Sequence, residues 1–387
     1  VRAAYGIFYD TPHLFFGTRY SNSPPWGAQI SLTNPAGGLS DPWSTYPGGS
    51  PFPDIRTNWA TSAFPLNGVY VTAPLDLKNT RLQQWNFSVQ KGWGDFLVAA
   101  SYLGNKGAHA WRANEQNPAV YGPGATTGNT NARRVLVQAN ADQGRYYATL
   151  GTIDDTGRTS YHGLLLSAQK RMSANWSILT NYTISKCMSD PITTEITGAT
   201  TMNPWNPDLD YSYCSSDRTH VWNLSAVMRV PTYTDKGFLG ALISDWQIAP
   251  IIRVQTGSRM SVTTGTDVAL TGTGNQRAVQ ILDDPYGDGT AQNFLNPAAF
   301  QNPATGTYST DKPYMLVGPG RFTNDLAISR SFKFGGARVF QFRWEIFNVI
   351  NHVNLDNPST ALNSAQFGKI TGAGDARIMQ LGFKFTF

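Results

Sequence analysis

The C-terminal segment Ala376–Phe387, with the sequence ARIMQLGFKFTF, is the feature that most restricts how this chain folds. One parity of the segment holds Met379, Leu381, Phe383, Phe385 and Phe387, and the other holds Ile378, Gln380, Gly382, Lys384 and Thr386. Because successive side chains of a strand point to opposite faces, this pattern predicts a strand with one apolar face and one mostly polar face. An edge strand of a soluble sheet shows the same alternation. The length, however, matches the roughly 9–11 residues that cross a bilayer as a tilted strand.

A strand that crosses lipid has to belong to a closed barrel, since the backbone finds no water to bond there. We therefore predict an all-β fold, an antiparallel transmembrane β-barrel of the outer membrane or part of one. Composition is compatible with this fold. Charged residues make up 14% of the chain, against roughly 25% in ordinary soluble domains. The net charge of +5 is dispersed, and no basic run exceeds Arg133-Arg134, so a nucleic-acid partner is not expected.

Nine further segments alternate in the same way, so the chain is expected to hold about ten strands. The other predicted strands are Arg2–Tyr9, Arg81–Lys91, Phe96–Gly104, Tyr161–Arg171, Trp176–Ser185, His220–Val230, Trp246–Thr256, Phe322–Phe334 and Arg338–Phe347. Val1 lies directly before the first of them, with no signal peptide ahead of it. We expect from this that the chain is a fragment. Many small residues on the inward faces, such as Ala99, Ser167 and Ser225, suit a wide barrel, so we also expect the first and last strands to leave unpaired edges.

The connections between these strands alternate between short and long. Short ones are expected near Gly92, Ser173 and Gly335, with a longer member at Thr232–Asp245. Long ones are expected at 10–79, 105–160, 187–218, 258–320 and 348–375. Outer-membrane barrels have short periplasmic turns and longer extracellular loops, and a soluble sandwich has no reason to sort its loops by end.

Aromatic residues provide a second sign of membrane insertion. With the short turns placed at the periplasm, six aromatics fall at that end of their strands: Phe96, Trp176, Trp246, Phe334, Phe340 and Phe387. Tyr102, Tyr182 and Trp222 fall toward the other end. Amphipathic rings settle at both membrane interfaces, so two aromatic girdles are expected of a barrel. The general preference of aromatics for strands is the simpler explanation, but it does not account for the sorting.

Several segments of the chain resemble one protein family. They are RAAYGIFYD, LQQWNFSVQK, ASYLGNKGAHAW, YHGLLLSAQKRMS, NYTISKCMSD, DRTHVWNLSAVMRVP, NPAAF, FRWEIFNVINHVNLDNP and IMQLGFKFTF. Together they resemble the C-terminal barrel portion of the Oar-like TonB-dependent outer-membrane receptors, a family with a carboxypeptidase-regulatory-like N-terminal domain. The resemblance covers nearly the whole chain except the loops, and EIFNVINHVN and the terminal strand are its most specific parts.

This resemblance implies a parent protein with a signal peptide, a small β-sandwich, a plug and a barrel of about 22 strands, the plugged class of barrel. It also implies uptake of a ligand across the outer membrane of a Gram-negative bacterium. The expected partners are outer-membrane lipid, the barrel assembly machinery, an unidentified ligand, and the TonB system acting through a region outside this chain. The candidate assembly signal is Phe383, Phe385 and Phe387.

Two groups of side chains are candidates for a structural or binding role. Charged residues on the polar parity are expected to face the lumen, namely Arg229, Arg253, Lys333, Arg343, Glu345 and Lys384. They are consistent with a substrate path or plug contacts, with Arg343 and Glu345 the first candidates for the plug, and equally with ordinary interior polarity. Cys187 and Cys214 flank one predicted outer loop and are expected to form a disulfide, since the compartment is oxidising. Two unrelated thiols are the alternative.

Signs of catalysis or of a cofactor are weak. The five histidines, His13, His109, His162, His220 and His352, share no metal-ligand spacing. Neither a nucleophile elbow, a zinc-protease motif, a phosphate-binding loop nor a dinucleotide fingerprint occurs. Asp283–Gly289 clusters carboxylates near glycines but lacks the spacing and distal Glu of an EF-hand, which favours a solvated turn. We expect neither enzyme activity, nor a metal, nor a cofactor.

Three functions are compatible with these observations. The first is a transporter fragment that takes up a ligand too large for porins. The second is an adhesion or matrix-binding outer-membrane protein, whose long loops contact a surface. The third is a secreted carbohydrate-binding β-protein, against which the sorted loops and Phe387 argue. The sequence does not identify the ligand.

Overall fold

The computed structural model describes residues 1–10, 37–44, 49–50, 67–192, 200–234, 237–335 and 337–387. Much of the expected 10–79 connection, including His13, lies outside these residues, as do parts of the 187–218 and Thr232–Asp245 connections. Among the described residues, no helix is long and apolar enough to cross a membrane.

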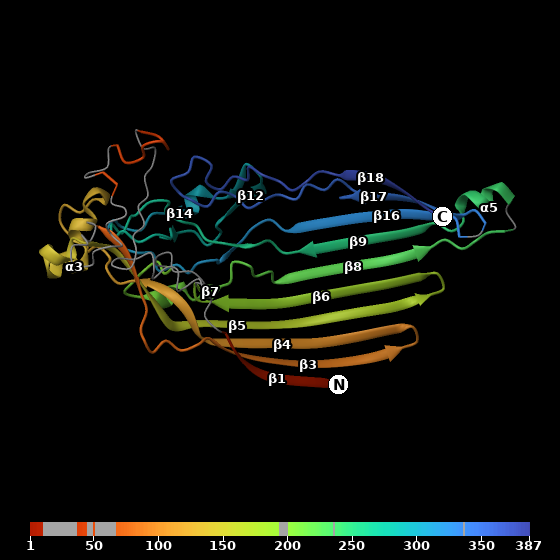
Figure 1. The fold of residues 1–387 in the computed structure, drawn as a ribbon, viewed down its shortest axis with the longest axis horizontal. Helices are drawn as coiled ribbons and strands as arrows, with labels where there is room; N and C mark the ends of the chain where they lie inside the picture. The colour runs from red at the N-terminus through yellow and green to blue at the C-terminus, as the bar shows by residue number, and fades with distance from the viewer. Residues whose placement is uncertain (11–36, 45–48, 51–66, 193–199, 235–236, 336) are drawn as a thin grey trace.

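One antiparallel sheet dominates the structure, and the order of the strands across it follows their order in the sequence (Figure 1). The path runs β1 (Arg2–Tyr9), β3 (Arg81–Trp93), β4 (Phe96–Glu115), β5 (Tyr147–Ser173), β6 (Trp176–Ser189), β8 (His220–Arg229), β9 (Gln247–Gln255), β16 (Arg321–Lys333), β17 (Val339–Phe347) and β18 (Ile378–Thr386). All ten predicted strands are present. Their bounds on the turn side agree with the prediction to within about three residues.

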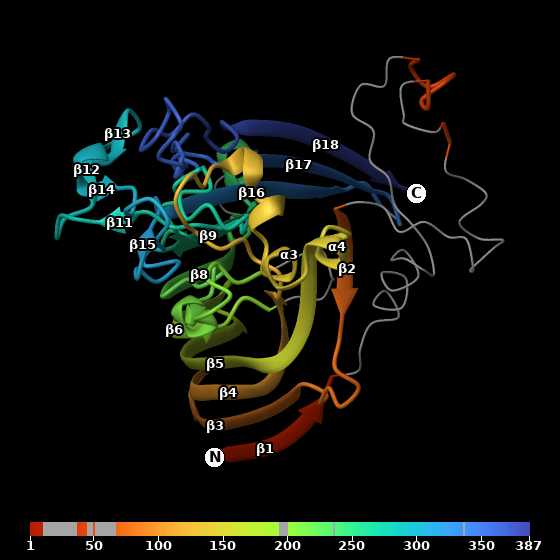
Figure 2. The same cartoon turned by 90° about the vertical axis from the view of Figure 1, so that its left-hand side faces the viewer.

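The sheet is curved but not closed. Viewed along the strands, it forms an arc from β1 at one edge to β18 at the other (Figure 2). In the described part of the chain, β1 pairs with β3 alone and β18 pairs with β17 alone. The expected open edges are therefore observed, and the ladder between Arg2–Tyr9 and Arg377–Phe387 that a complete small barrel requires is absent from the described pairings.

The register of the sheet gives one face a continuous apolar character. Directly opposed residues of an antiparallel ladder share a face. Phe342 of β17 lies opposite Phe383, and Trp344 lies opposite both Leu381 and Ile328. Ile328 in turn lies opposite Ile248 of β9. The same parity continues to Ile252 and Leu224, which oppose each other. The alternation in the sequence predicts that the side chains facing lipid include Leu381, Phe383, Trp344, Phe342, Ile252 and Leu224, and the register places all six on one face.

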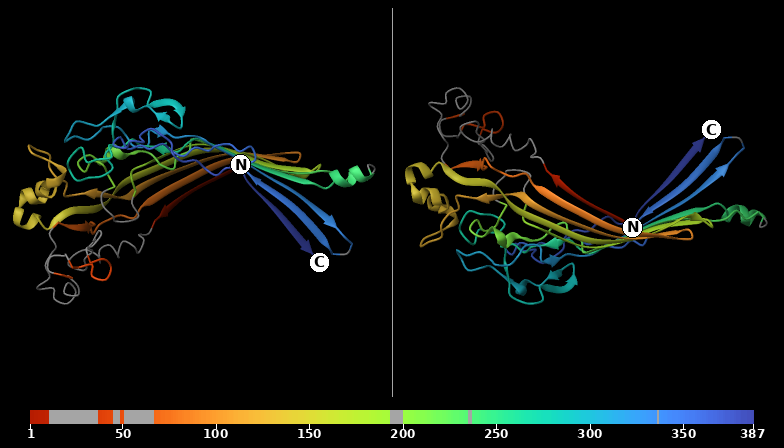
Figure 3. Two further views of the ribbon diagram at one scale, coloured as in Figure 1. Left: turned by 90° about the horizontal axis from the view of Figure 1, so that it is seen from above. Right: turned by 90° about the horizontal axis from the view of Figure 1, so that it is seen from below.

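Short connections gather at one end of the sheet. Between β5 and β6 the turn consists of Ala174 and Asn175, with φ of 45° and 67°. Positive φ at both central residues is the requirement of a type I′ turn, which matches the twist of the flanking strands. The 230–246 connection contains helix α5 (Gly237–Ile243). Figure 3 shows α5 beyond the ends of the strands, with the long loops at the opposite end.

Aromatic rings lie at the turn end, as the sequence predicts. Phe96 and Trp176 meet edge-on with ring centroids 6.1 Å apart. Trp246 meets Phe342 edge-on at 6.0 Å. Lys170 is also on this face, but its ammonium donates to the carbonyls of Ser173 and Trp176 at 2.8 and 3.0 Å. The lysine thus directs its charge toward the turn and away from the middle of the apolar face.

The prediction of a loop at 105–160 is wrong at both of its ends, where the structure has strand. β4 continues to Glu115 and β5 begins at Tyr147, so both strands extend well beyond the predicted ends at Gly104 and Tyr161. The register shifts between Ala108 and Ala110 and again before Arg112, and His109 between them has a φ of 59°. A bulge disrupts period-two alternation, which is the pattern that identifies a strand in a sequence.

Small elements build an assembly on the long-loop end. β2 (Gly68–Thr72) pairs in parallel with the extended part of β5, and β7 (Ser212–Tyr213) pairs with β6. The two-residue to five-residue strands are β10 (Arg259–Met260), β11 (Val279–Gln280), β12 (Tyr286–Thr290), β13 (Asn293–Leu295), β14 (Phe300–Gln301) and β15 (Leu316–Val317). The helical turns are η1 (Thr127–Asn129), η2 (Asn131–Arg133), α3 (Val135–Ala139), α4 (Ala141–Gly144), η3 (Pro207–Asp210) and η4 (Pro297–Ala299).

The hydrophobic core lies in this loop assembly. Its buried members are Met260, Val262, Ala278, Leu295, Ala299, Phe300, Leu316 and Phe367. Gly368 passes close to this cluster with a φ of 76°, and a Cβ there would come within 2.5 Å of the Leu295 carbonyl. Only glycine suits that position. The 258–320 and 348–375 connections therefore pack together as an ordered domain-like layer, and not as separate loops.

Candidate functional site

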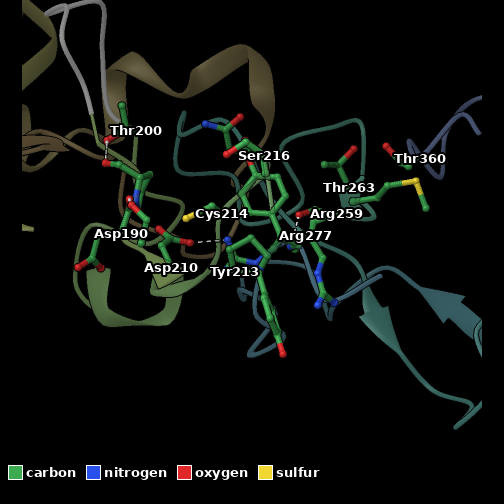
Figure 4. Close-up of a pocket in the computed structure, with 18 of the residues that line it drawn as sticks. Asp190, Thr200, Asp210, Tyr213, Cys214, Ser216, Arg259, Thr263, Arg277 and Thr360 are labelled. Carbon is green, nitrogen blue, oxygen red and sulfur yellow. Dashed lines mark hydrogen bonds and ion pairs between the residues drawn. The ribbon is translucent and has the colours of Figure 1, made fainter. Parts of the chain in front are cut away.

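A polar pocket of about 890 Å³ lies in the loop assembly, between the outer end of β6 and the 258–320 connection (Figure 4). Hydroxyl and amide groups form much of its wall, among them Thr200, Ser216, Thr263, Asn275, Asn357 and Thr360. Tyr213, the Cys214 end of a disulfide, and the charged side chains of Asp190, Asp210, Arg259 and Arg277 complete it.

Asp210 and Arg277 form a buried ion pair on one wall of the pocket. Their side chains are 4% and 6% exposed, and Figure 4 shows the guanidinium directed at the carboxylate. The second carboxylate oxygen of Asp210 accepts the backbone N–H of Met202 at 2.8 Å. The guanidinium Nε of Arg277 donates to the carbonyl of Asp311 at 2.7 Å. Both charges are thus paired and hydrogen-bonded, which is the condition under which buried charges are tolerated.

Arg259 and Asp217 form a second pair beside the disulfide. The Arg259 Nε donates to Asp217 Oδ2 at 3.2 Å, and its guanidinium lies 3.7 Å from the centre of the Tyr213 ring. Asp217 Oδ1 accepts the backbone N–H of Cys187 at 2.8 Å. One carboxylate therefore joins β10 to the end of β6. Burial lowers the pKa of the neighbouring Arg218, and the negative charge of Asp217 works in the opposite direction.

The two cysteines expected to pair are disulfide-bonded in the structure. Their Cα atoms are 5.4 Å apart, within the 7 Å that a bridge allows. The backbone N–H of Cys214 also donates to the Cys187 carbonyl at 3.0 Å. The bridge closes the 190–219 connection onto the strand that begins it, and so it fixes the wall that carries Tyr213.

Asp190 joins this wall to the long strands. Its carboxylate is fully buried and accepts the backbone N–H of Arg158 at 2.8 Å and the Arg158 Nε at 3.2 Å. The Arg112 side chain of β4 lies 3.6 Å from the other oxygen and also binds Asp154 at 3.1 Å. The extended parts of β4 and β5, which were not predicted from the sequence, therefore hold Asp190 of the pocket wall from behind without lining the pocket themselves.

Together the pocket charges cancel, since two arginines and two aspartates line it and each is held by a partner. The arrangement offers a surface without net charge, in which hydroxyl, amide and aromatic groups alternate with apolar side chains such as Ile192, Met260 and Pro313. In the described residues, no group of three or more His, Cys, Asp or Glu side chains is placed to hold a metal ion.

The carboxylate-rich segment Asp283–Gly289 runs into the β12–β13 hairpin. Asp284 Oδ1 accepts the backbone N–H of Tyr286 at 3.0 Å, and Asp288 Oδ1 accepts that of Thr290 at 2.9 Å. These bonds to Thr290, from its side chain and its backbone, lower the pKa of Asp288. The carboxylates thus shape an exposed turn, which agrees with the solvated turn that the sequence favours.

The six charged residues expected to face the lumen all lie on the polar face of the sheet. Their opposed residues are Gln247 for Arg229, Asn223 for Arg253, Val339 for Lys333, Gly382 for Arg343, Gln380 for Glu345 and Gln341 for Lys384. Arg343 and Glu345 form an ion pair, and Glu345 also accepts a hydrogen bond from Gln380. The structure brings these two together and leaves the other four spread along the face. Their contact with a plug stays a prediction.

The pocket pairs escaped the sequence analysis because their partners are distant in the chain. Arg277 and Asp210 are separated by 67 residues, and Arg259 and Asp217 by 42. No local spacing identifies such pairs. The two cysteines were the one signal, since they mark the ends of the connection that forms the wall.

A curved antiparallel sheet with one continuous apolar face, one polar face and loops sorted by end defines the class of membrane-spanning β-barrels. A family model described as an outer membrane beta barrel domain matches residues 1–380. The chain therefore belongs to the outer membrane beta barrel domain family, and it resides in the outer membrane. A secreted carbohydrate-binding protein is inconsistent with this location.

The solved structures similar to this chain include two outer-membrane transporters. The outer membrane transporter YddB from Escherichia coli is 13% identical, with a TM-score of 0.45 over 85% of this chain and 35% of that chain. The FrpB iron transporter from Neisseria meningitidis (F3-3 variant) is 14% identical, with a TM-score of 0.39 over 82% of this chain and 32% of that chain. This chain thus spans about a third of their length. A search of curated proteins finds no match.

Proposed function

We propose that this chain forms part of the wall and the outer binding surface of a TonB-dependent receptor of the Oar-like group, which imports a polar ligand across the outer membrane. The polar pocket at the loop end is the observation that carries the proposal. Its walls are fixed by a disulfide and by buried Arg–Asp pairs, so the cavity is formed before a ligand arrives. Preorganisation of this kind lowers the entropic cost of binding.

The polar face of the sheet supports a wide barrel. Many of its side chains are small, including Ala99, Ser101, Ser167, Ser177, Asn223, Ser225, Ala249 and Ser329. A narrow barrel has its interior filled by its own side chains, whereas these leave space for a separate plug. The unpaired edges of β1 and β18 also need partners, because lipid does not satisfy backbone groups. Further strands in the assembled protein supply both the larger circumference of the barrel and the partners of its two edges.

The ligand class follows from the wall of the pocket. Because its arginines and aspartates are paired with one another, a charged ligand gains little there and would disturb those pairs. Hydroxyl and amide side chains remain available for hydrogen bonds, and Tyr213 and Tyr314 provide flat apolar surface. An uncharged ligand rich in hydroxyl or amide groups matches this chemistry.

The test uses the full-length protein in its native cells, grown with a mixed extract of neutral oligosaccharides and peptides. Mass spectrometry measures which compounds leave the medium. We expect depletion that requires both the receptor and TonB, and that falls at least tenfold when Asn275→Leu and Thr263→Val fill the pocket wall with apolar groups. Asp288→Ala, on the exposed β12–β13 hairpin, is the matched control and should leave depletion unchanged.

Adhesion is the competing function, and the same cells distinguish it. Attachment to a surface that needs the receptor but not TonB, without any depletion of the medium, would replace the transport proposal. If the pocket variants do not change the depletion, the protein is a transporter but the pocket does not bind the transported ligand.

A further inference from the structure

Helix α5 presents a cluster of exposed apolar side chains at the turn end of the sheet. Phe238 is 83% exposed, Leu239 66%, Leu242 56% and Ile243 43%. In their described residues, the other short connections, such as the two-residue turn at Ala174 and Asn175, contain no helix. Such exposure is costly in water, so the helix needs an apolar surrounding.

Two outward-facing side chains tie the end of this helix to the apolar side of the sheet. Arg330 of β16 lies opposite Phe342, which places it on the apolar face. Its guanidinium donates to the Leu242 carbonyl at 2.8 Å and to the Ala241 carbonyl. The indole N–H of Trp246 donates to the same Leu242 carbonyl at 2.9 Å. Free carbonyls at the C-terminus of a helix carry partial negative charge, and a cation there is favourable.

Arg330 would otherwise be out of place among lipid-facing residues. A charged side chain on the lipid face is unfavourable near the middle of the bilayer and tolerated near its interface. Its guanidinium lies 4.7 Å from the centre of the Phe332 ring and 5.7 Å from that of Trp246, in the aromatic zone at the turn end. The arginine therefore marks the interface, and α5 begins where the apolar face ends.

The connection itself is held in shape by polar contacts. Thr232 donates to Asp245 at 2.6 Å, and the backbone N–H of Tyr233 donates to the Ser244 hydroxyl at 2.8 Å. Ser244 is buried and bonds back to the Gly240 carbonyl at the centre of the helix. Because the polar side chains bond within the connection, the apolar ones remain directed outward.

We propose that α5 is an interfacial helix that inserts its apolar side chains among phospholipids of the periplasmic leaflet, next to the barrel wall. Its apolar surface continues that of the sheet, which contacts the same lipid. Short turns of outer-membrane barrels are periplasmic, so this end of the sheet meets the phospholipid leaflet. Interfacial helices bury their apolar face about 5–10 Å into the headgroup and acyl boundary.

The experiment places an environment-sensitive NBD fluorophore on Leu239→Cys in the full-length protein, reconstituted in phosphatidylcholine–phosphatidylglycerol vesicles. Cys187 and Cys214 are disulfide-bonded and do not compete for the label. Lys384→Cys, on the polar face toward the same end, is the matched control. We expect lipids carrying a doxyl group near the headgroup to quench position 239 at least threefold more than position 384. Iodide, added on both sides of the membrane, should quench position 384 more strongly than position 239.

Arg330→Met gives a second arm. Loss of the two hydrogen bonds should raise iodide quenching at position 239 at least twofold, while the gel shift of the folded barrel on heating is retained. If iodide quenches position 239 of the original protein as strongly as position 384, the proposal is wrong. Protection from both quenchers would also overturn it, because the helix would then be covered by protein. Phe238→Cys repeats the measurement if Leu239→Cys does not fold.

Discussion

The hydroxyl of Tyr182 lies 2.7 Å from Nδ1 of His220 on the adjacent strand, and the two rings stack with centroids 6.0 Å apart. Tyr102 and His162 repeat the arrangement on another strand pair, with 2.7 Å between the atoms and 6.2 Å between the centroids. Both pairs lie on the apolar face toward the long-loop end. Each gives the polar tip of an outward tyrosine a partner at the position where the upper aromatic girdle is expected.

Removing one of these tyrosine hydroxyls should lower the stability of the barrel by a small amount. Tyr182→Phe keeps the ring stack but loses the hydrogen bond, so we expect a loss of about 1 kcal/mol in the free energy of unfolding from vesicles. Tyr5→Phe serves as control, because its hydroxyl makes a long 3.4 Å contact with Gln83 at the exposed edge. Equal losses in both variants would contradict a defined role for the pair.

The assignment of an apolar and a polar face predicts very different losses of stability for two neighbouring residues of β17. Phe342→Arg places a charge on the lipid side and should cost roughly 2–4 kcal/mol in refolding stability. Gln341→Arg should cost far less, because Gln341 lies on the polar face opposite Lys384 and Ser331. Urea titration of refolding into vesicles measures both. Similar values for the two substitutions would show that the faces are assigned incorrectly.

Loss of the disulfide should affect the outer assembly and spare the membrane strands. For Cys187→Ser with Cys214→Ser, loop-closure entropy predicts a loss of about 3.5 kcal/mol in the segment between the cysteines, which are 27 residues apart. Hydrogen exchange should become faster at β7 and at Asp217. The amides of β6 from Trp176 to Ile184 should exchange as before, and acceleration there would mean that the bridge supports the whole sheet.

The buried Asp210–Arg277 pair predicts strong coupling between two distant parts of the chain. Arg277→Met leaves the Asp210 carboxylate buried without its cation, and should destabilise the outer assembly by about 3–5 kcal/mol. Adding Asp210→Asn should recover part of that loss, because no charge is then left unpaired. Limited proteolysis of the loop assembly measures all three proteins. Simple additivity of the two substitutions would argue against the pair.

Alkaline pH provides a further test of the loop assembly. Burial raises the pKa of Tyr308, although hydrogen bonds with the Thr271 and Thr273 hydroxyls work the other way. The unfolded chain therefore releases this proton first, at a pH of about 10. Stability of the assembly should be full below that pH and should decline above it, until the folded tyrosine also ionises. Tyr308→Phe should remove this part of the decline in near-ultraviolet circular dichroism.

The membrane part of the fold was predictable because lipid imposes a strict pattern. β17 was expected at Arg338–Phe347 and is observed at Val339–Phe347, since nearly every second residue has to be apolar there. The extended ends of β4 and β5 were not predictable in this way. Outside the bilayer, no constraint keeps the alternation, and the bulges near His109 disrupt what remains of it.

The disulfide was the one part of the pocket that the sequence predicted. Two cysteines in a chain of 387 residues are a conspicuous pair. The arginines are not, because Arg259 and Arg277 stand among 30 basic residues with nothing local to distinguish them. Their partners are determined by the packing of the 258–320 connection on β6 and β7, a long-range arrangement that alternation does not encode.

The length of β5 has a mechanical consequence. Its 27 residues run without interruption from the turn end to Tyr147, and the part from Tyr147 to Ser160 adds roughly 45 Å of strand at about 3.3 Å per residue. β4 pairs with it through most of this extension. Asp190 of the pocket wall is therefore held by a two-stranded extension of the sheet, through Arg158 and Arg112. A force applied along this extension at its outer end loads the backbone hydrogen bonds between β4 and β5 in shear, all together. Such a force therefore reaches the barrel wall with little lengthening of the strands.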